Sequence, residues 1–396
     1  MAYSREIIGV VLGGGKGTNM EPLTPHLEKS LIRLLGKPLI YYPVKNLTQL
    51  GLKSIYIISR NPPKISNELG RYFEGVSLEN IGQRGDDLNS ALKMIGEVAV
   101  GKGTMVISFS DVILPQNAYE LALSSHVNSG KAVTVLMTPL SDLQGYFEVE
   151  VNEGVSIDKV STHKSGYAWT GILIAESDFA KSLYKSGGDI NETLKQFKGN
   201  INVALWSGWF VDVSYPWDLL TAVKYLLSDV NETRISRDAN ISPRAVIEGP
   251  VIIDSGARVD HGAIIKGPAY IGVNAYVGNN AIIRNSTSLE EESVVGADAE
   301  ITESLIGCKA TVGRGSFIGS SVIGDESTIE PGVVTLNVLP SGVEVSHISP
   351  VIVKGKQIAK LGAIVGPRTR IGANSVIYPG SIIDANKYVQ PLSILK

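Results

Sequence analysis

The chain has 396 residues, and 36 Lys and Arg residues nearly balance 39 Asp and Glu residues, which leaves a net charge of −3. A chain without a basic excess is not expected to bind nucleic acid or an anionic membrane surface. One cysteine, Cys308, excludes a disulfide framework, and the start of the chain lacks a signal-peptide pattern, so we expect a cytoplasmic protein. The length exceeds what one hydrophobic core usually supports, so we expect two domains.

The first part of the chain alternates short β-branched runs with longer amphipathic segments. Strands are expected at residues 7–12, 54–58, 104–108, 132–137 and 171–175, and helices at 39–50, 87–97, 118–128 and 218–227. This alternation is typical of an α/β fold with a doubly wound, Rossmann-like, mainly parallel sheet. We assign this domain to residues 1–230. Ligands of such sheets bind beyond the carboxyl ends of the strands.

From Asn240 onward the sequence repeats every six residues. Aliphatic residues recur in one register at Ile241, Ile247, Ile253, Val259, Ile265, Ile271, Val277, Ile283, Leu289, Val295 and Ile301. The repeat returns near the C-terminus at Val365, Ile371, Ile377 and Ile383. It predicts a parallel β-helix, because each coil stacks its apolar residue on that of the previous coil. The pattern resembles the left-handed β-helix of the hexapeptide-repeat acyltransferases, and we assign it to residues 239–396.

Two segments lie outside these patterns. Residues 228–238 are polar and are interpreted as a linker between the domains. Residues 336–360 interrupt the six-residue repeat and predict an extended loop or hairpin. Loops of this kind in the hexapeptide family often reach a neighbouring subunit, so the resemblance implies a homo-oligomer formed through the β-helix.

A glycine-rich segment follows the first expected strand. Residues 12–20 read Leu-Gly-Gly-Gly-Lys-Gly-Thr-Asn-Met. Glycines at such a corner let the backbone approach a phosphate closely, and the amide N–H groups then point at its oxygens. The spacing matches neither GxxxxGK[ST] nor GxGxxG, the two commonest phosphate-binding patterns.

This segment resembles the signature of the sugar-1-phosphate nucleotidylyltransferases, or NDP-sugar pyrophosphorylases, which is roughly GGxGTRLxPLT followed by Lys-Pro and Gly-Lys-Pro. The chain supplies residues 14–18, 22–24 and 36–38, together with Lys29. The resemblance covers nearly the whole chain, since a C-terminal β-helix is common in the family. It implies that a nucleoside triphosphate and a sugar-1-phosphate react to give an NDP-sugar and pyrophosphate, with Mg²⁺ as cofactor.

The resemblance also implies which residues bind the nucleotide. These are Leu12, Gly14, Gly15, Lys16, Gly17, Thr18 and Asn19 in the loop, with Gln83 and Gly85 as a weaker match to the family's base-recognition segment. Asp86 and Asp87 follow where the family usually has Gly-Thr-Ala. Two carboxylates there would repel a triphosphate unless a metal ion or Arg84 compensates their charge.

Three residues are candidates for the chemistry. Lys29 takes the place of the family's catalytic lysine, and Asp111 and Asp212 take the places of its two magnesium ligands. Carboxylates suit Mg²⁺, which would neutralise charge between two anionic substrates. The alternative for Lys29 is a solvated surface lysine, and the alternative for each aspartate is a cap on the turn after a strand.

The chain departs from the family in the loop and in the sugar site. Asn19 replaces an arginine whose charged, planar group holds the triphosphate. The sugar would lie against Tyr146, Glu150, Trp169 and Thr170. Phe147 replaces a glycine there and is expected to intrude. Lys159 or Lys164 could replace the sugar-site lysine.

Three functions therefore remain open. The chain is interpreted first as a nucleotidylyltransferase with reduced or altered activity. It could instead be a catalytically silent subunit that binds nucleotide or NDP-sugar and regulates an active paralogue. The third interpretation is a β-helix acyltransferase, although Arg314 lies where that family has its catalytic histidine, and arginine cannot act as a base at neutral pH.

Overall fold

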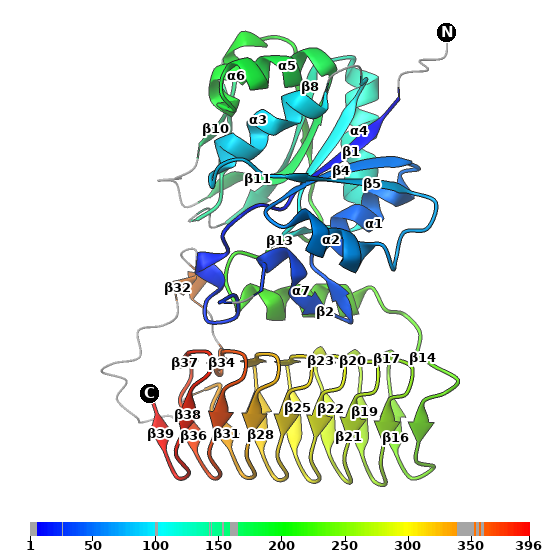
Figure 1. Ribbon diagram of the computed structural model, residues 1–396, viewed down its shortest axis with the longest axis vertical. Helices are drawn as coiled ribbons and strands as arrows, with labels where there is room; N and C mark the ends of the chain where they lie inside the picture. Colours follow the sequence, from blue (N-terminus) through cyan, green and yellow to red (C-terminus); the bar gives the residue numbers. More distant parts are fainter. Residues whose placement is uncertain are drawn as a thin grey trace.

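The computed structural model describes residues 6–25, 27–99, 102–141, 143, 145–152, 154–158, 165–338, 352–353, 356–357 and 360–396. Figure 1 shows an N-terminal α/β domain above a long array of coils. None of the helices in the described ranges has both the length and the apolar character needed to span a bilayer.

A nine-stranded sheet forms the centre of the N-terminal domain. Its parallel part consists of β6 (Met105–Phe109), β1 (Ile8–Leu12), β4 (Ser54–Ser59) and β5 (Ser77–Gly82), in that order. The antiparallel strand β11 (Gly166–Ala175) continues the sheet beside β6, followed by β8 (Val133–Leu140), β9 (Glu148–Val151), β10 (Val155–Asp158) and β12 (Ile201–Leu205). The predicted doubly wound, mainly parallel sheet is therefore confirmed.

Helices cover both faces of this sheet. They are α1 (Tyr41–Gln49), α2 (Pro62–Leu69), α3 (Leu88–Val98), α4 (Gln116–Ser129), α5 (Ser177–Lys185), α6 (Ile190–Gln196) and α7 (Asp218–Ser228). Leu92 of α3 and Phe179 of α5 belong to one buried cluster, and Leu47 of α1 and Tyr119 of α4 belong to another. The sheet is thus buried on both sides, which explains why its central strands read as continuous apolar runs.

The C-terminal domain is a left-handed β-helix built from three parallel sheets of eight strands each. The first sheet contains β14 (Arg234–Ile235), β17 (Val251–Ile253), β20 (Ala269–Ile271), β23 (Thr287–Leu289), β26 (Leu305–Ile306), β29 (Val322–Ile323), β34 (Ile364–Val365) and β37 (Ile382–Ile383). The second contains β15 (Asn240–Ile241), β18 (Arg258–Val259), β21 (Tyr276–Val277), β24 (Val294–Val295), β27 (Thr311–Val312), β30 (Thr328–Ile329), β35 (Arg370–Ile371) and β38 (Tyr388–Val389). The third contains β16 (Val246–Glu248), β19 (Ile264–Lys266), β22 (Ile282–Arg284), β25 (Glu300–Thr302), β28 (Phe317–Gly319), β31 (Val334–Thr335), β36 (Val376–Ile377) and β39 (Ile394–Leu395).

The six-residue repeat accounts for this architecture. Ile271, Val277 and Ile283 follow one another in the repeat and are fully buried, each on a different sheet. In the ladder, Ile271 pairs with Ile253 on one side and Leu289 on the other, so equivalent residues stack into columns. Within the segment that interrupts the repeat, β32 (Ile352–Val353) and β33 (Lys356–Gln357) pair antiparallel as a hairpin.

The two domains share a buried interface. The helix α7 and the hairpin of β2 (Arg33–Leu34) and β3 (Lys37–Pro38) lie between the sheet and the coils in Figure 1. Leu219 and Val223 of α7 pack in one apolar cluster with Tyr270 and Leu305 of the β-helix. The β-helix therefore supports the side of the domain that carries the hairpin and the end of the glycine-rich loop.

A buried carboxylate of the β-helix completes this interface. Glu290 accepts hydrogen bonds from the backbone N–H groups of Leu35 and Gly36 at 2.9 and 2.8 Å and from the Ser288 hydroxyl at 2.6 Å. Gly36 has a φ of 72°, so the turn directs both N–H groups at one anion. Burial raises the pKa of Glu290 to about 7, although these three hydrogen bonds oppose the change.

We predict that Glu290→Gln reduces the dependence of stability on pH. Glu290 has a higher pKa in the folded protein than its ordinary 4.5, so the folded state binds the proton more tightly and stability falls as pH rises from about 4.5 to about 7. This contribution is about 3 kcal/mol at most. Thermal midpoints across this pH range should fall less steeply for the variant than for the wild type.

Glu292→Gln provides the control, because it removes an exposed carboxylate two residues away and should leave the wild-type slope unchanged. Glutamine can accept at only one oxygen, so a uniformly lower midpoint is compatible with the prediction. Parallel curves for Glu290→Gln and the wild type would contradict it.

Candidate nucleotide-binding active site

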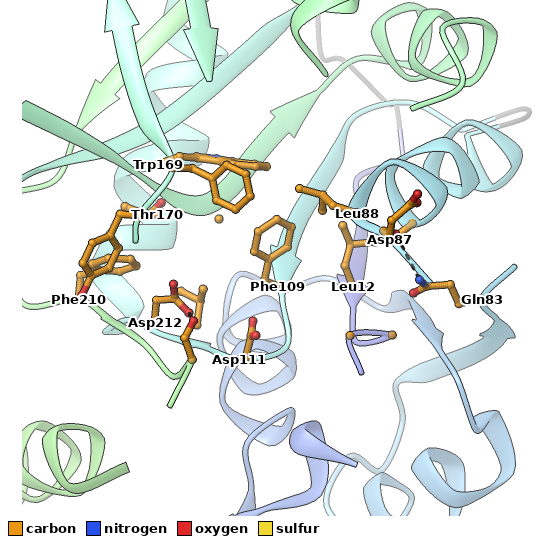
Figure 2. Close-up of a pocket in the computed structure, with 18 of the residues that line it drawn as sticks. Leu12, Gln83, Asp87, Leu88, Phe109, Asp111, Trp169, Thr170, Phe210 and Asp212 are labelled. Carbon is orange, nitrogen blue, oxygen red and sulfur yellow. Dashed lines mark hydrogen bonds between the residues drawn. The ribbon is translucent and has the colours of Figure 1, made fainter. Parts of the chain in front are cut away.

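A cavity of about 230 Å³ opens beyond the carboxyl ends of β1 and β6. It is lined by Leu12, Gly14, Gly15, Gln83, Asp86, Asp87, Leu88, Ala91, Phe109, Asp111, Val112, Tyr146, Phe147, Trp169, Thr170, Gly171, Phe210, Asp212 and Ser214. Figure 2 shows Gln83 and Asp87 on one side, Asp111 and Asp212 on the other, and Phe109 between them. The cavity thus lies where a sheet of this type binds its ligands.

The glycine-rich loop begins as a continuation of β1. The Gly13 N–H donates to the carbonyl of Ile58 at 2.7 Å, and the Ser110 N–H donates to the carbonyl of Leu12 at 2.9 Å. Gly14 and Gly15 then line the cavity. An added Cβ at Gly15 would have no heavy atom within 4 Å, so the backbone there is open to a ligand.

The second half of the loop turns away from the cavity. Gly17 adopts a φ of 67°, a left-handed conformation that favours glycine, and its carbonyl accepts from the Thr24 hydroxyl at 2.9 Å. Thr18 and Asn19 open the short 3-10 helix η1 (Thr18–Met20), where both are exposed. Lys16, Gly17, Thr18 and Asn19 do not line the cavity, although the sequence assigns them to the nucleotide.

Gln83 packs directly on the first half of the loop. Its side chain occupies the space where a Cβ of residue 14 would project, which explains the glycine at that position. The Gln83 amide nitrogen donates to the carbonyls of Gly85 and Asp87 at 3.1 and 3.5 Å. Its Oε1 is buried and has no hydrogen-bond partner, so the described protein groups leave an acceptor unused at the cavity wall.

The two carboxylates after Gly85 have different roles. Asp87 caps α3 by accepting from the N–H of Ser90 at 2.7 Å. Asp86 forms ion pairs with Lys16, at 2.7 Å, and with Arg60. Arg84, which the sequence offers as the compensating cation, instead pairs with Glu97 at 3.4 Å.

Sequence reasoning missed Arg60. It follows β4 directly and therefore lies at the same edge of the sheet as the glycine-rich loop. Its Nε donates to the carbonyl of Gly14 at 2.9 Å. The available signal was a cation at the carboxyl end of a buried parallel strand, where ligands of such sheets bind.

Asp111, Asp212 and Lys29 meet at the other end of the cavity. β7 (Val112–Ile113) and β13 (Val211–Asp212) pair antiparallel with Asp212 opposite Val112, next to Asp111 in the chain. The Val213 N–H donates to the Asp111 carbonyl at 2.9 Å, and the Ser214 hydroxyl donates to the Asp212 carboxylate at 2.9 Å. Two segments a hundred residues apart thus bring both aspartates to one wall.

Lys29 forms a partly buried ion pair with Asp111. Burial alone would lower the pKa of its ammonium group, but Asp111 and Asp212 outweigh this and the pKa rises above its ordinary value. The backbone at Gly17 allows Lys29 to pack against the loop, because an added Cβ there would lie 3.1 Å from the Lys29 Cβ. Lys29 is therefore a protonated cation between the loop and the two aspartates, not a solvated surface lysine.

The residues at this end fit a magnesium ion. Asp111 and Asp212 both line the cavity, and carboxylate oxygens are the protein ligands that Mg²⁺ prefers, with water and substrate phosphate completing its shell. In the described part of the chain, no group of three or more His, Cys, Asp or Glu residues could hold a metal ion. A two-carboxylate arrangement of this kind suits an ion that arrives with a phosphate substrate.

Aromatic side chains form the remaining wall. Trp169 makes edge contacts with Phe109 and Phe147, with ring centroids 5.0 and 6.0 Å apart. Its indole N–H donates to the carbonyl of Ile172 at 3.0 Å, and the Thr170 hydroxyl donates to the carbonyl of Leu136 at 2.9 Å. Both expected sugar-binding donors are therefore engaged within the protein.

Of the other expected sugar-binding residues, some line the cavity and some do not. Tyr146 lines the cavity and lies 5.9 Å from Phe210 between ring centroids. Phe147 also lines it, in the place where a glycine was expected from the resemblance. Glu150 lies on β9 and does not line the cavity. Lys159 and Lys164 lie outside the described residues.

Comparisons with known proteins agree with this geometry. The family model described as nucleotidyl transferase matches residues 8–192, and the model described as GMPPB C-terminal domain matches residues 247–341. A structure of a putative glucose-1-phosphate thymidylyltransferase from Bacillus anthracis has a TM-score of 0.51 at 24% identity, covers 58% of this chain and 98% of that chain, and supports the fold. The family model, together with this fold, supports a nucleotidyltransferase.

Curated relatives make the assignment more specific. The chain is 27% identical to a bifunctional sugar-1-phosphate nucleotidylyltransferase/acetyltransferase of Sulfurisphaera tokodaii, over 97% of this chain and 96% of that protein. It is 28% identical to the bifunctional protein GlmU of Methanococcus aeolicus, over 96% and 92% of the two chains. It is also 31% identical to a glucose-1-phosphate thymidylyltransferase of Mycolicibacterium smegmatis, over 45% and 65%. Over nearly its full length, the chain is therefore similar to sugar-1-phosphate nucleotidylyltransferases.

We predict that Asp111→Asn removes the Mg²⁺-dependent part of nucleotide binding. The substitution deletes one of the two carboxylates at this end of the cavity, and loss of a direct ligand should weaken metal-dependent affinity by at least as much as loss of a supporting contact, which costs about tenfold. Calorimetric titration of a nucleoside triphosphate with and without Mg²⁺ measures this difference.

Glu120→Gln is the control for this variant, since it removes an exposed carboxylate of α4 that does not line the cavity and leaves Asp111 and Asp212 in place. It should keep most of the magnesium effect. An Asp111→Asn protein whose affinity still responds fully to Mg²⁺ would remove Asp111 from the metal site.

Proposed function

We propose that this protein transfers a nucleotidyl group from a nucleoside triphosphate to a sugar-1-phosphate and releases pyrophosphate, with reduced activity because Asn19 replaces the family arginine. One observation carries the proposal. The first half of the glycine-rich loop, Gln83, Asp111 and Asp212 line one cavity, and Lys29 is paired with Asp111 beside it. Such a reaction needs a backbone that binds the triphosphate, a side chain that contacts the nucleobase, and charged groups that bind the two phosphates.

Each end of the cavity has its own task in this proposal. The backbone of Gly14 and Gly15 binds the triphosphate, and the Gln83 side chain, which lines the cavity and packs on Gly14, contacts the base. Lys29 orients the sugar phosphate and the α-phosphate toward each other. Asp111 and Asp212 would hold Mg²⁺, which supplies charge neutralisation between the two anions when bound.

The aromatic wall would bind the sugar in the proposed complex. Phe109, Phe147 and Trp169 present ring faces and edges, and the hydrogen-bond donors of Trp169 and Thr170 are already used. Such a wall excludes water and packs on the apolar face of a sugar ring, and it leaves polar recognition of the sugar to Tyr146 and the phosphate-binding groups.

A silent regulatory subunit is the second candidate. The engaged donors of the sugar wall and the intruding Phe147 favour it, because both weaken binding of the sugar while Gly14 and Gly15 still line the other end of the cavity. The neutral Asn19 also favours it, because the charge that would stabilise nucleotidyl transfer is missing. In that case the protein would bind nucleotide or NDP-sugar beside an active paralogue.

The resemblance also implies that the protein forms a homo-oligomer through the β-helix, in the cytoplasm.

Acyl transfer by the β-helix is a lesser candidate. The bifunctional relative of Sulfurisphaera tokodaii carries acetyltransferase in its name and matches nearly the full chain. Arg314, which lies where the family has its catalytic histidine, is exposed here and cannot accept a proton at neutral pH.

Pyrophosphate release with Mg²⁺ tests the proposed function, with each nucleoside triphosphate and dTTP against several sugar-1-phosphates. We predict that Asn19→Arg raises the rate at least about tenfold, because one charged transition-state contact is worth roughly a hundredfold. Asn19→Gln lengthens the side chain without adding charge and should leave the rate close to that of the wild type.

The outcomes separate the candidates. Release by the wild-type chain identifies an enzyme and its substrates. Silence from the wild type and from Asn19→Arg, together with measurable nucleotide binding, would instead establish the regulatory interpretation.

A further inference from the structure

A cluster of three charged side chains lies at the loop end of the cavity. The Asp86 carboxylate lines the cavity and pairs with Lys16, at 2.7 Å, and with Arg60. The three residues come from three separate segments, the glycine-rich loop, the end of β4 and the turn before α3. The Asp86 carboxylate therefore connects Lys16 and Arg60 beside the part of the cavity that is lined by Gly14 and Gly15.

Arg60 is tied to the loop itself. Its Nε donates to the Gly14 carbonyl at 2.9 Å, while another nitrogen of the same guanidinium pairs with Asp86. A guanidinium carries five N–H donors in a fixed plane, so it can hold the loop backbone and an anion at the same time. The position of this anion is thus fixed relative to the backbone that lines the cavity.

The same end of the cavity has room for a larger anion. Gly14 and Gly15 line it, and the space around Gly15 is open. Asn19, where the family has its arginine, is exposed outside the cavity and is neutral. Lys29, at the opposite end, is engaged by Asp111. Lys16 and Arg60 do not line the cavity themselves, but both are paired with Asp86, which does, so they are the cations that a triphosphate at the loop would reach by displacing Asp86.

We propose that Asp86 is an internal substitute for the triphosphate, and that the incoming triphosphate displaces its carboxylate from Lys16 and Arg60. In the nucleotide complex, Arg60 and Lys16 then supply the positive charge that Asn19 does not. The inference rests on the proposed function for its ligand but assigns new roles to Arg60 as a binding residue and to Asp86 as a competitor.

The exchange follows from the relative strength of the contacts. The Asp86 side chain is 59% exposed, and an exposed ion pair is weak. A triphosphate offers more charge and several oxygens, so it binds a guanidinium and an ammonium group more strongly than one carboxylate does. Arg60 also faces Glu28, whose pKa is raised by burial while Arg60 and Lys64 lower it.

Calorimetric titration with inorganic tripolyphosphate, and in parallel with a nucleoside triphosphate, tests the inference on the full chain in Mg²⁺. Arg60→Gln and Lys16→Gln should each weaken binding of both probes by about tenfold, the typical effect of one charge-assisted contact. Asp86→Asn removes the competing charge and should tighten binding by about threefold. In Arg60→Gln/Asp86→Asn, the gain from the second substitution should shrink, because one of its two cations is gone.

Arg84 and Glu97 provide matched controls. They form an exposed ion pair on α3 and the turn before it, and neither lines the cavity. Arg84→Gln and Glu97→Gln change the net charge by the same amounts as the test variants and should leave both affinities unchanged. Asp86→Ala serves as a second variant, with thermal midpoints to show that each protein is folded.

The inference is overturned if Asp86→Asn and Asp86→Ala bind tripolyphosphate no more tightly than the wild type, or if Arg60→Gln behaves like Arg84→Gln. Its failure differs from failure of the proposed function. A wild type that binds and responds as predicted but releases no pyrophosphate leaves the inference intact. A wild type that turns over normally while the variants bind alike would refute the inference alone.

Discussion

The ion pair between Lys29 and Asp111 is the contact on which the site depends, because it joins the segment that packs against the glycine-rich loop to the turn after β6. Lys29 packs against Gly17, whose left-handed backbone leaves room for it, and its charge also faces Asp212. A cation held this way lets two carboxylates lie side by side without mutual repulsion in a partly buried position. In the proposed function, the two carboxylates would bind the metal ion and Lys29 would bind phosphate.

Charge is balanced separately at the two ends of the cavity. Asp111 and Asp212 face Lys29 at one end, and Asp86 faces Lys16 and Arg60 at the other, with the aromatic side chains of Phe109, Phe147 and Trp169 along the wall. Each of these cations is already paired with a carboxylate. A polyanion that binds to them must therefore displace that carboxylate. This offers a physical reason why the chain can lack the loop arginine, because its positive charge is distributed over other segments.

The β-helix contributes to the site through its support of the loop. Met20, at the end of the loop, is fully buried in the apolar cluster that also contains Tyr270 and Leu305 of the coils. Glu290 holds the β2–β3 turn through two backbone N–H groups. The stack of coils thus packs against one end of the glycine-rich loop, whereas the backbone at Gly15 is open. The domain interface is in this sense part of the site.

The sequence determined the fold class by itself, because buried strands and stacked coils both require apolar residues at regular positions along the chain. It failed for β5, whose residues are largely exposed at the sheet edge and carry no apolar run. The sequence also identified the glycine-rich loop, Lys29, Asp111 and Asp212 as candidate site residues, because each lies in a short motif that can be recognised locally. Only the tertiary structure decided that Arg60 pairs with Asp86, that Glu150 lies off the cavity, and that the donors of Trp169 and Thr170 are already used. Those outcomes depend on contacts between segments distant in the chain, and a local pattern does not encode which side chain meets which.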